Sequence, residues 1–304
     1  MADVALIAID WGTTAARAYA VDRHDGILAS RSAPLGVQQL ASGGYAIALE
    51  ALLGDWMALR VPRIAAGMIG SRQGWIEAPY LPCPATFESM ASHIVETPSR
   101  ELAIVPGLIT HDESGVPDVM RGEEAQLAGA FDDNARALAV LPGTHSKWAM
   151  VERGKVVEFA SYMTGELYAV LLAHSILGRL AHSSETAAAP NAAFEAGIAR
   201  GLVEGGLAHR VFAARTLALT GSIDGRDVPD YLSGVLIGDE IASARAWAAR
   251  RGHDSSHVHV IGADALVDRY IAALGSAGID AGRGPSDAAV RGITRMARLS
   301  GRIE

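Results

Sequence analysis

A strand–turn–strand unit with a Gly-Thr turn occurs twice in the sequence. The first copy reads Leu6-Ile-Ala-Ile-Asp10-Trp-Gly12-Thr13-Thr14 and the second Leu138-Ala-Val-Leu-Pro-Gly143-Thr144-His145-Ser146-Lys147. Glycine lets a backbone approach an anion closely, and threonine hydroxyls and free N–H groups can donate to phosphate oxygens. The pair predicts two related domains that hold a polyphosphate between them, as in a nucleotide-driven phosphotransferase.

The order of predicted elements also repeats, about 130 residues apart. Each half begins with three strands and a helix: residues 4–10, 15–21, 27–32 and 45–59, then 138–141, 147–151, 156–161 and 165–180. Charged and small residues at 132–136 interrupt the apolar pattern. We therefore expect an N-terminal lobe over 1–134 and a C-terminal lobe over 135–304. A last helix over 286–299 is expected at the lobe junction.

Length and composition restrict the class of protein. The chain has 304 residues, enough for two domains with their own cores. No apolar run approaches the roughly 20 residues of a membrane-spanning helix, and no signal-peptide pattern opens the chain. A net charge of −8 argues against a nucleic-acid partner, and a single cysteine excludes a disulfide framework. We expect a cytoplasmic protein that binds small molecules, with a homodimer left open.

Asp10 ends the first predicted strand, beside the Gly12-Thr13-Thr14 turn. A carboxylate repels phosphate, so its place at such a turn makes sense if Mg²⁺ or its water shell lies between the two. The alternative is an aspartate that caps the turn backbone.

In the second turn, Thr144, His145 and Ser146 offer hydroxyl and imidazole donors next to Gly143. Lys147 could neutralise a phosphate or hold an anionic substrate, or it could be a solvated lysine at a strand start. No Gly-x-Ser-x-Gly elbow accompanies these residues, which argues against a serine hydrolase.

Two carboxylates, Glu123 and Glu124, follow Arg121-Gly122 at the start of a predicted helix. A kinase needs a carboxylate that orients a substrate hydroxyl and accepts its proton. Either glutamate could do so, and the alternative is that both only complement the helix dipole.

Candidate substrate and nucleoside residues lie in other loops. Ser71-Arg72-Gln73 follows a predicted strand; arginine can clamp a carboxylate and glutamine can pair with hydroxyls. Arg121 and Arg17 are further candidates for the same anion. Glu166 starts the matching helix of the second half and could reach the substrate, or it could be a cap acid. Gly262 ends a strand and would let adenosine lie against the backbone. Residues 231–240 would form the facing wall, with Asp239 and Glu240 beginning a helix.

Together these residues resemble the actin/hexokinase/Hsp70 superfamily of ATP-dependent phosphotransferases. Within it, four stretches resemble the 2-dehydro-3-deoxygalactonokinase family: residues 67–80, 118–124, 141–148 and 163–167. The resemblance implies an α/β fold of two RNase H-like domains, with mixed sheets flanked by helices and an interlobe cleft. It also implies ATP and Mg²⁺ as cofactors.

The implied reaction is phosphorylation of the C6 hydroxyl of 2-dehydro-3-deoxy-D-galactonate, a step of galactonate and galactose breakdown. In glycerol kinase-like relatives the substrate loop matches Ser71-Arg72-Gln73. Their catalytic aspartate matches Glu123, a longer acid, so the choice between Glu123 and Glu124 stays open. The alternatives are a kinase of another sugar acid or polyol, an exopolyphosphatase-like hydrolase, and a nucleotide-gated binding protein.

Overall fold

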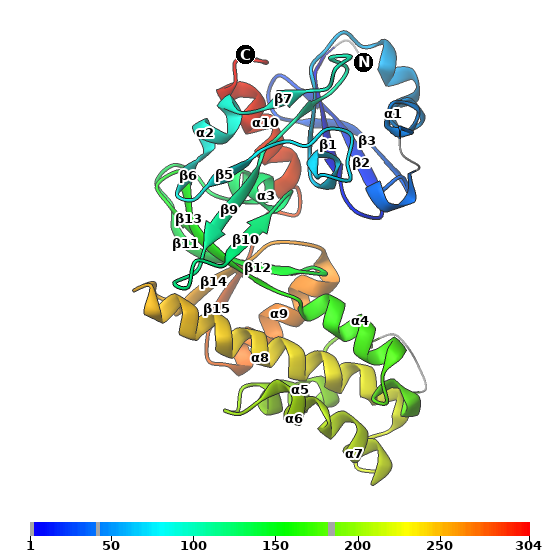
Figure 1. Ribbon diagram of the computed structural model, residues 1–304, viewed down its shortest axis with the longest axis vertical. Coiled ribbons are helices and arrows are strands. Elements are labelled where there is room, and N and C mark those ends of the chain that lie inside the picture. The colour runs from blue at the N-terminus through cyan, green and yellow to red at the C-terminus, as the bar shows by residue number, and fades with distance from the viewer. Residues whose placement is uncertain (1–2, 41–42, 182–185) are drawn as a thin grey trace. The chain divides into compact units, whose positions relative to one another are not determined.

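The computed structural model describes residues 3–40, 43–181 and 186–304, which form two compact units (Figure 1). Unit 1 comprises Met1–Arg136, Val151–Phe159 and Asp287–Glu304, and unit 2 comprises Ala137–Met150 and Ala160–Ser286. The last helix thus belongs to unit 1. The division into lobes at residues 134 and 135 stays a prediction.

The strands follow the predicted pattern closely in both halves of the chain. They are β1 (Val4–Trp11), β2 (Ala16–Asp22), β3 (Ile27–Ala33), β4 (Arg63–Ala66), β5 (Tyr80–Pro82), β6 (Ala85–Thr86), β7 (Val95–Glu96), β8 (Ala103–Ile104), β9 (Gly107–His111), β10 (Pro117–Met120), β11 (Arg136–Leu141), β12 (Ser146–Glu152), β13 (Lys155–Tyr162), β14 (His257–Val260) and β15 (Asp280–Arg283).

The helices differ more from prediction than the strands do. They are α1 (Tyr45–Leu53), α2 (Phe87–Ser92), α3 (Glu123–Ala130), α4 (Thr164–His174), α5 (Ala192–Gly201), α6 (Leu207–Val211), α7 (Ala213–Leu219), α8 (Val228–Arg250), α9 (Asp264–Ser276) and α10 (Ala288–Leu299). No helix among these described residues is long and apolar enough to cross a bilayer.

The main sheet of unit 1 has the strand order β3-β2-β1-β4-β8-β7. β1 pairs antiparallel with β2 and parallel with β4, and β4 pairs parallel with β8. The hairpin of β1 and β2 places Asp10 opposite Arg17. The carboxyl ends of the parallel strands β1 and β4 therefore meet at one edge, where the Gly12 turn and the 67–75 loop begin.

A second six-stranded sheet has the order β15-β14-β11-β12-β13-β6. Its strands β13, β12, β11, β14 and β15 stand in the same order as β3, β2, β1, β4 and β8 of the first sheet. β11 and β14 run parallel, as do β14 and β15. The repeated order of elements predicted from the sequence is confirmed. A smaller sheet has the order β10-β9-β5, and its strand β10 is followed directly along the chain by α3.

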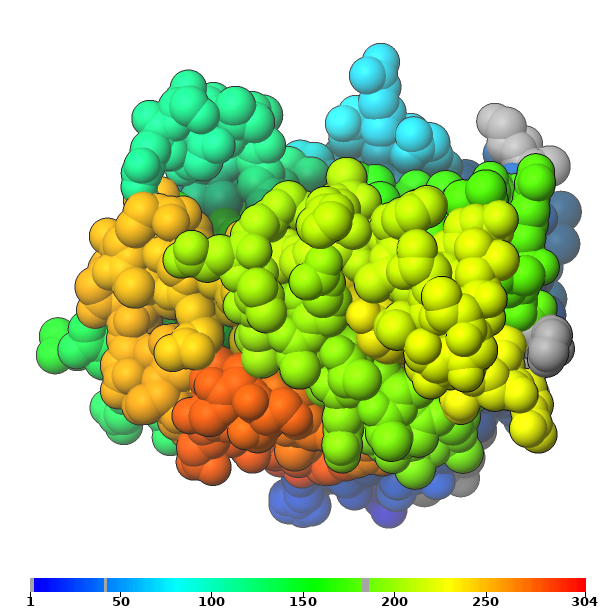
Figure 2. Space-filling model, turned by 90° about the horizontal axis from the view of Figure 1, so that it is seen from below, coloured from blue at the N-terminus to red at the C-terminus, as the bar shows by residue number. Residues whose placement is uncertain are grey.

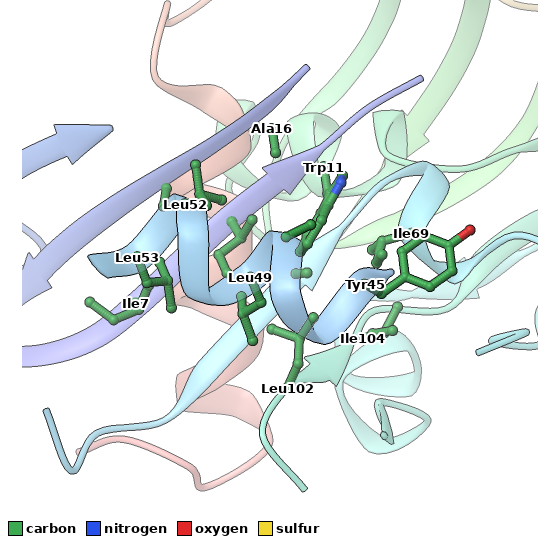
Figure 3. Close-up of a cluster of buried hydrophobic side chains, with 14 of the residues drawn as sticks. Ile7, Trp11, Ala16, Tyr45, Leu49, Leu52, Leu53, Ile69, Leu102 and Ile104 are labelled. Carbon is green, nitrogen blue, oxygen red and sulfur yellow. The ribbon is translucent and has the colours of Figure 1, made fainter. Parts of the chain in front are cut away.

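The core of unit 1 lies between its main sheet and α1 (Figure 3). Ile7 and Trp11 point from β1 toward Leu49 and Leu52 of α1. Side chains alternate along a strand, so Leu6 and Ala8 face the other side of the sheet, where α10 contacts β1 and β4. This burial on both faces explains the continuous apolar run that leads to Asp10.

Unit 2 is dominated by the long helix α8, with α5, α6 and α7 packed along it (Figure 1). Figure 2 shows the face that α5 to α7 cover, in yellow-green. α5 and α8 approach closely because their glycines face each other: a Cβ on Gly197 would lie 2.2 Å from the Tyr231 oxygen.

Two helix predictions in unit 2 are wrong. α8 begins at Val228, with Pro229 in its first turn, so Asp239 and Glu240 lie inside a helix and do not begin one. The apolar pattern also predicts a helical stretch over roughly 191–213, but residues 202–206 are not helical and separate α5 from α6.

Candidate active site

The first Gly-Thr turn joins β1 to β2 and is tightly braced within unit 1. The Gly12 N–H donates to the Ala15 carbonyl at 2.9 Å, and the carbonyls of Gly12 and Thr13 accept from Val37 and Gln38. Thr14 is exposed, and the hydroxyls of Thr13 and Thr14 form no hydrogen bond with any other described residue. The backbone is thus fixed while the donor groups stay available.

Asp10 lies at the mouth of this turn with its side chain 29% exposed. Its nearest cation is Arg17, whose Nη1 lies 3.6 Å from Oδ2, too far for a close hydrogen-bonded pair. Partial burial raises the pKa of Asp10, and Arg17 offsets part of that rise. A half-buried carboxylate with a loosely held partner suits a hydrated cation.

The 67–75 loop folds against the first turn. Gly67 has φ +103°, and a Cβ there would lie 2.6 Å from the Trp11 carbonyl oxygen. Gly122, just before α3, has φ +109°, and a Cβ there would lie 3.2 Å from the Gly67 Cα. Only glycine fits both positions easily. The turn after Asp10, the 67–75 loop and the start of α3 therefore meet at one corner of unit 1.

The loop presents two polar side chains on a rigid frame. Ser71, Gly74 and Trp75 donate backbone hydrogen bonds to Met68, Ser71 and Ile69. Arg72 and Gln73 are exposed at the tip, whereas Ser71 is buried with its hydroxyl unpartnered. The guanidinium of Arg72 forms no ion pair with another described residue.

The two glutamates of α3 have different surroundings. Glu123 is partly exposed and its Oε2 accepts the Arg121 N–H at 3.1 Å. Glu124 is fully buried and its Oε2 accepts the Gly122 N–H at 2.6 Å. Burial, with a smaller contribution from neighbouring Glu123, raises the pKa of Glu124 to about 8. Glu124 is therefore predominantly neutral at pH 7, which leaves Glu123 as the accessible carboxylate.

Arg121 is buried, unlike Arg72. Its Nη2 donates to the Ala78 carbonyl at 2.7 Å and its guanidinium lies 4.2 Å over the Tyr80 ring. A Cβ on Gly70 would come within 2.9 Å of its Nη1. Nε and Nη1 are buried without a hydrogen-bond partner among the described residues. Arg121 thus lies directly beneath the loop that carries Arg72.

In unit 2, the second turn is tied to the start of α4. The backbone N–H of Glu166 donates to the Thr144 carbonyl at 2.9 Å. The Glu166 side chain also contacts the turn, because Oε2 of Glu166 lies 2.5 Å from His145 Nε2. A Cβ on Gly165 would lie 2.4 Å from the Gly143 oxygen, so the close approach requires glycine. Thr144 and His145 are exposed, but only the Thr144 hydroxyl is an accessible side-chain donor, because Nε2 of His145 is bonded to Glu166.

Ser146 and Lys147 face the interior of unit 2. Ser146 is fully buried and its hydroxyl donates to Glu240 at 2.8 Å. Lys147 is 6% exposed, and its Nζ donates to Ser161 Oγ at 2.5 Å. Both side chains are buried and engaged within unit 2, in contrast to the exposed hydroxyl of Thr144.

A cavity of about 110 Å³ adjoins the second turn within unit 2. Its lining comes from Gly143, Thr164, Gly165, Tyr168, Thr186, Ser233, Leu236, Ile237, Leu266, Arg269 and Tyr270. Part of segment 231–240 does line it, as a side of α8. Gly262 lies beside the second turn, since a Cβ there would be 3.5 Å from the Pro142 oxygen.

Several residues of this cavity were not predicted from the sequence. Tyr168 has a buried hydroxyl without a hydrogen-bond partner among the described residues, and burial raises its pKa to about 12. Arg269 pairs with Asp230 at 2.6 Å, and both are almost fully buried. The available signal was the presence of three acids, Asp230, Asp239 and Glu240, in an otherwise largely apolar stretch of α8.

The chain is similar to several known proteins. The family model for 2-keto-3-deoxy-galactonokinase matches residues 10–296. The 2-dehydro-3-deoxygalactonokinase of Escherichia coli (strain K12) is 37% identical over 275 residues, which cover 90% of each chain. A Rhizobium meliloti (strain 1021) protein, "Probable 2-dehydro-3-deoxygalactonokinase DgoK1", is 36% identical over 298 residues, covering 96% of each.

A solved structure agrees with these sequence matches. The structure described as "Crystal structure of a putative 2-dehydro-3-deoxygalactonokinase protein from Sinorhizobium meliloti" has a TM-score of 0.88 at 35% identity. The match covers 96% of this chain and 98% of that chain. The likeness and the repeated mixed sheets flanked by helices confirm the predicted two-domain α/β fold. The chain belongs to the 2-keto-3-deoxy-galactonokinase family.

Proposed function

We propose that this protein transfers the γ-phosphoryl group of ATP to the C6 hydroxyl of 2-dehydro-3-deoxy-D-galactonate. The observation that carries the proposal is the meeting of three segments in unit 1: the turn after Asp10, the Arg72-Gln73 loop and the start of α3. They bring phosphate donors, an exposed arginine and a carboxylate to one corner, as sugar-acid phosphorylation requires. The activity named for the E. coli relative supports this substrate.

The triphosphate is assigned to the two Gly-Thr turns. The hydroxyls of Thr13 and Thr14 donate from the first turn, and the Thr144 hydroxyl donates from the second. The Nε2–H of His145 is bonded to Glu166, so His145 is assigned to the phosphates through its backbone N–H. The Ser146 hydroxyl is engaged by Glu240, so only its backbone remains for this task. Asp10 would hold Mg²⁺ through water, and the bound cation would neutralise charge on the phosphate oxygens.

Glu123 is the proposed base. It shares the corner of unit 1 with the substrate loop, and unlike Glu124 it is partly exposed. A base accepts a proton only when ionised, and the raised pKa of Glu124 keeps that carboxyl protonated at pH 7. Glu124 instead fixes the Gly122 backbone at the start of α3.

Arg72 and Gln73 are assigned to the sugar acid. The exposed guanidinium of Arg72 can bind the carboxylate through two parallel hydrogen bonds, and Gln73 can pair with hydroxyls. Buried Arg121 supports the loop from below and adds positive potential. Lys147 has a comparable buried position in unit 2, bonded to Ser161.

The nucleoside is assigned to the cavity of unit 2. Leu236, Ile237 and Leu266 provide apolar walls for a base, and Gly143 at its rim belongs to the second turn. The unpartnered hydroxyl of Tyr168 would gain a polar partner there. A largely apolar cavity that also carries placed polar groups is typical of small-molecule and cofactor sites.

The test is a coupled ADP-release assay with ATP and Mg²⁺ over a panel of sugar acids and polyols. We expect 2-dehydro-3-deoxy-D-galactonate to give the highest kcat/KM, with phosphate on C6 by NMR. A higher value for the gluco-configured acid or for a polyol would redirect the substrate assignment. Polyphosphate hydrolysis without a sugar acid would contradict the kinase proposal.

Substitution of Glu123 tests the proposed base. Glu123→Gln keeps the side-chain shape but removes the basic oxygen, so we expect kcat to fall by about 10²- to 10⁴-fold. The melting temperature should change by only a few degrees. Near-normal turnover of this variant would refute the assignment, and Glu195→Gln, an exposed glutamate of α5, serves as the matched control.

A further inference from the structure

Glu240 is a buried carboxyl group at the middle of α8 that accepts four side-chain hydrogen bonds. Ser146 and Trp148 donate to its Oε1, both at 2.8 Å. Tyr270 donates to its Oε2 at 2.7 Å, and the Thr164 hydroxyl donates to the same oxygen. The donors come from β12, α4 and α9, so one side chain connects four elements of unit 2.

The network is complete at both carboxylate oxygens. Burial raises the pKa of Glu240, and its four hydrogen bonds oppose that rise. A buried polar group without partners is costly, whereas a fully satisfied network fixes the relative positions of its members. Glu240 therefore resists displacement of any one of the four elements.

The four donors lie at functional positions. Ser146 directly follows His145 of the second turn, and Thr164 begins α4, whose Gly165 and Glu166 contact that turn. Thr164 and Tyr270 also line the cavity assigned to the nucleoside. The phosphate donors and the nucleoside walls are thus connected through Glu240, which itself lines neither.

We propose that Glu240 is a positioning residue for ATP: it holds the second phosphate turn and the nucleoside cavity at the spacing that a nucleoside triphosphate requires. The inference rests on the proposed function, because it takes the turn and the cavity as parts of one ATP site. Glu240 acts through Ser146, Thr164 and Tyr270, without touching the nucleotide.

Glutamine at position 240 is a sharp probe of this role. The Trp148 N–H can only donate, so the amide oxygen must face it, and the amide NH₂ must face Thr164 and Tyr270. Those hydroxyls can rotate to accept, so the fold is kept. The amide nitrogen of the variant no longer accepts from Thr164 and Tyr270, so the bonds that hold α4 and α9 to this oxygen are lost or reversed.

The experiment compares Glu240→Gln with the intact protein by calorimetry, with ATP and Mg²⁺ and no sugar acid. We expect the Kd for ATP to rise about tenfold, and the KM for the sugar acid to stay within about twofold. The exposed control Glu195→Gln should bind ATP normally. Thr164→Val, which removes one donor at nearly constant volume, should raise the Kd less, and it replaces Glu240→Gln if that variant does not fold.

An unchanged Kd for ATP with a lowered melting temperature would overturn the inference, because it would leave Glu240 a purely stabilising role. Equal increases in the KM values for ATP and for the sugar acid would also overturn it. A different result would contradict the proposed function, namely that the intact protein binds ATP but phosphorylates no sugar acid.

Discussion

Glu123 and Glu124 are adjacent in the chain but chemically different. Glu124 is fully buried, with Oε1 unpartnered and Oε2 bound to the Gly122 N–H. Glu123 is partly exposed at the corner that holds the substrate loop. Burial therefore separates one partly exposed carboxylate from one neutral carboxyl that holds the backbone of Gly122 in place.

The neutral state of Glu124 predicts a pH-dependent stability difference. Its pKa is raised from an ordinary 4.5 to about 8 in the folded chain, so the folded state binds its proton more tightly than the unfolded state. The stabilising contribution of the protonated group is complete below about pH 4.5 and is lost as pH rises through about 8. Glutamine at this position carries no such proton.

Melting curves of the intact protein and Glu124→Gln between pH 5 and 9 test this. We expect the variant to gain in relative melting temperature as pH rises, and the gain to level off above about pH 8. A constant difference over this range would show that Glu124 is ionised throughout.

At the scale of elements, the 67–75 loop is anchored to α1 by a hydrogen bond and a stacked ring pair. Tyr45, the first residue of α1, donates its hydroxyl to the Gln73 carbonyl, and its ring stacks on Trp75 with a centroid distance of 6.3 Å. The ring also belongs to the core shown in Figure 3. The tip that carries Arg72 is thereby anchored to the hydrophobic core of unit 1.

Tyr45→Phe should weaken sugar-acid binding. The substitution keeps the stacked ring but removes the bond to Gln73, so the loop tip loses one restraint. We expect the KM for the sugar acid to rise about three- to tenfold with the KM for ATP unchanged. In the double variant with Arg72→Ala the two effects should not add, and strict additivity would contradict a role exercised through Arg72.

Helices α3 and α10 cross at a pair of glycines. A Cβ on Gly292 would lie 1.7 Å from the Ala125 oxygen, and one on Gly129 would lie 2.0 Å from the Ala288 oxygen. Gly292→Ala should therefore lower the free energy of unfolding by about 1–3 kcal/mol, measured by denaturant titration. Gly275→Ala is the control, because its Cβ meets nothing within 4 Å and should be neutral or stabilising. Equal free energies of unfolding for the two variants would show that α3 and α10 accommodate the added methyl group without loss of stability.

At the scale of the whole molecule, the repeated strand order could be predicted from the sequence, because each copy carries its own apolar run and Gly-Thr turn. The turn, loop and α3 residues could likewise be placed as candidates. The cavity of unit 2 could not be predicted, because Tyr168, Leu236 and Tyr270 come from three separate helices and no local sequence pattern joins them. Glu240 was misjudged for the same reason: its four donors lie 30 to 94 residues away in the chain.

The discontinuity of unit 1 has a consequence for biosynthesis. β1 and β4 leave the ribosome early, whereas α10, which contacts both, is made last. Synthesis proceeds at roughly 5–20 residues per second, so about ten seconds or longer pass between the synthesis of the strand face that carries Leu6 and Ala8 and that of α10, which covers it. This apolar strand face of the nascent chain therefore stays without its covering helix during most of translation.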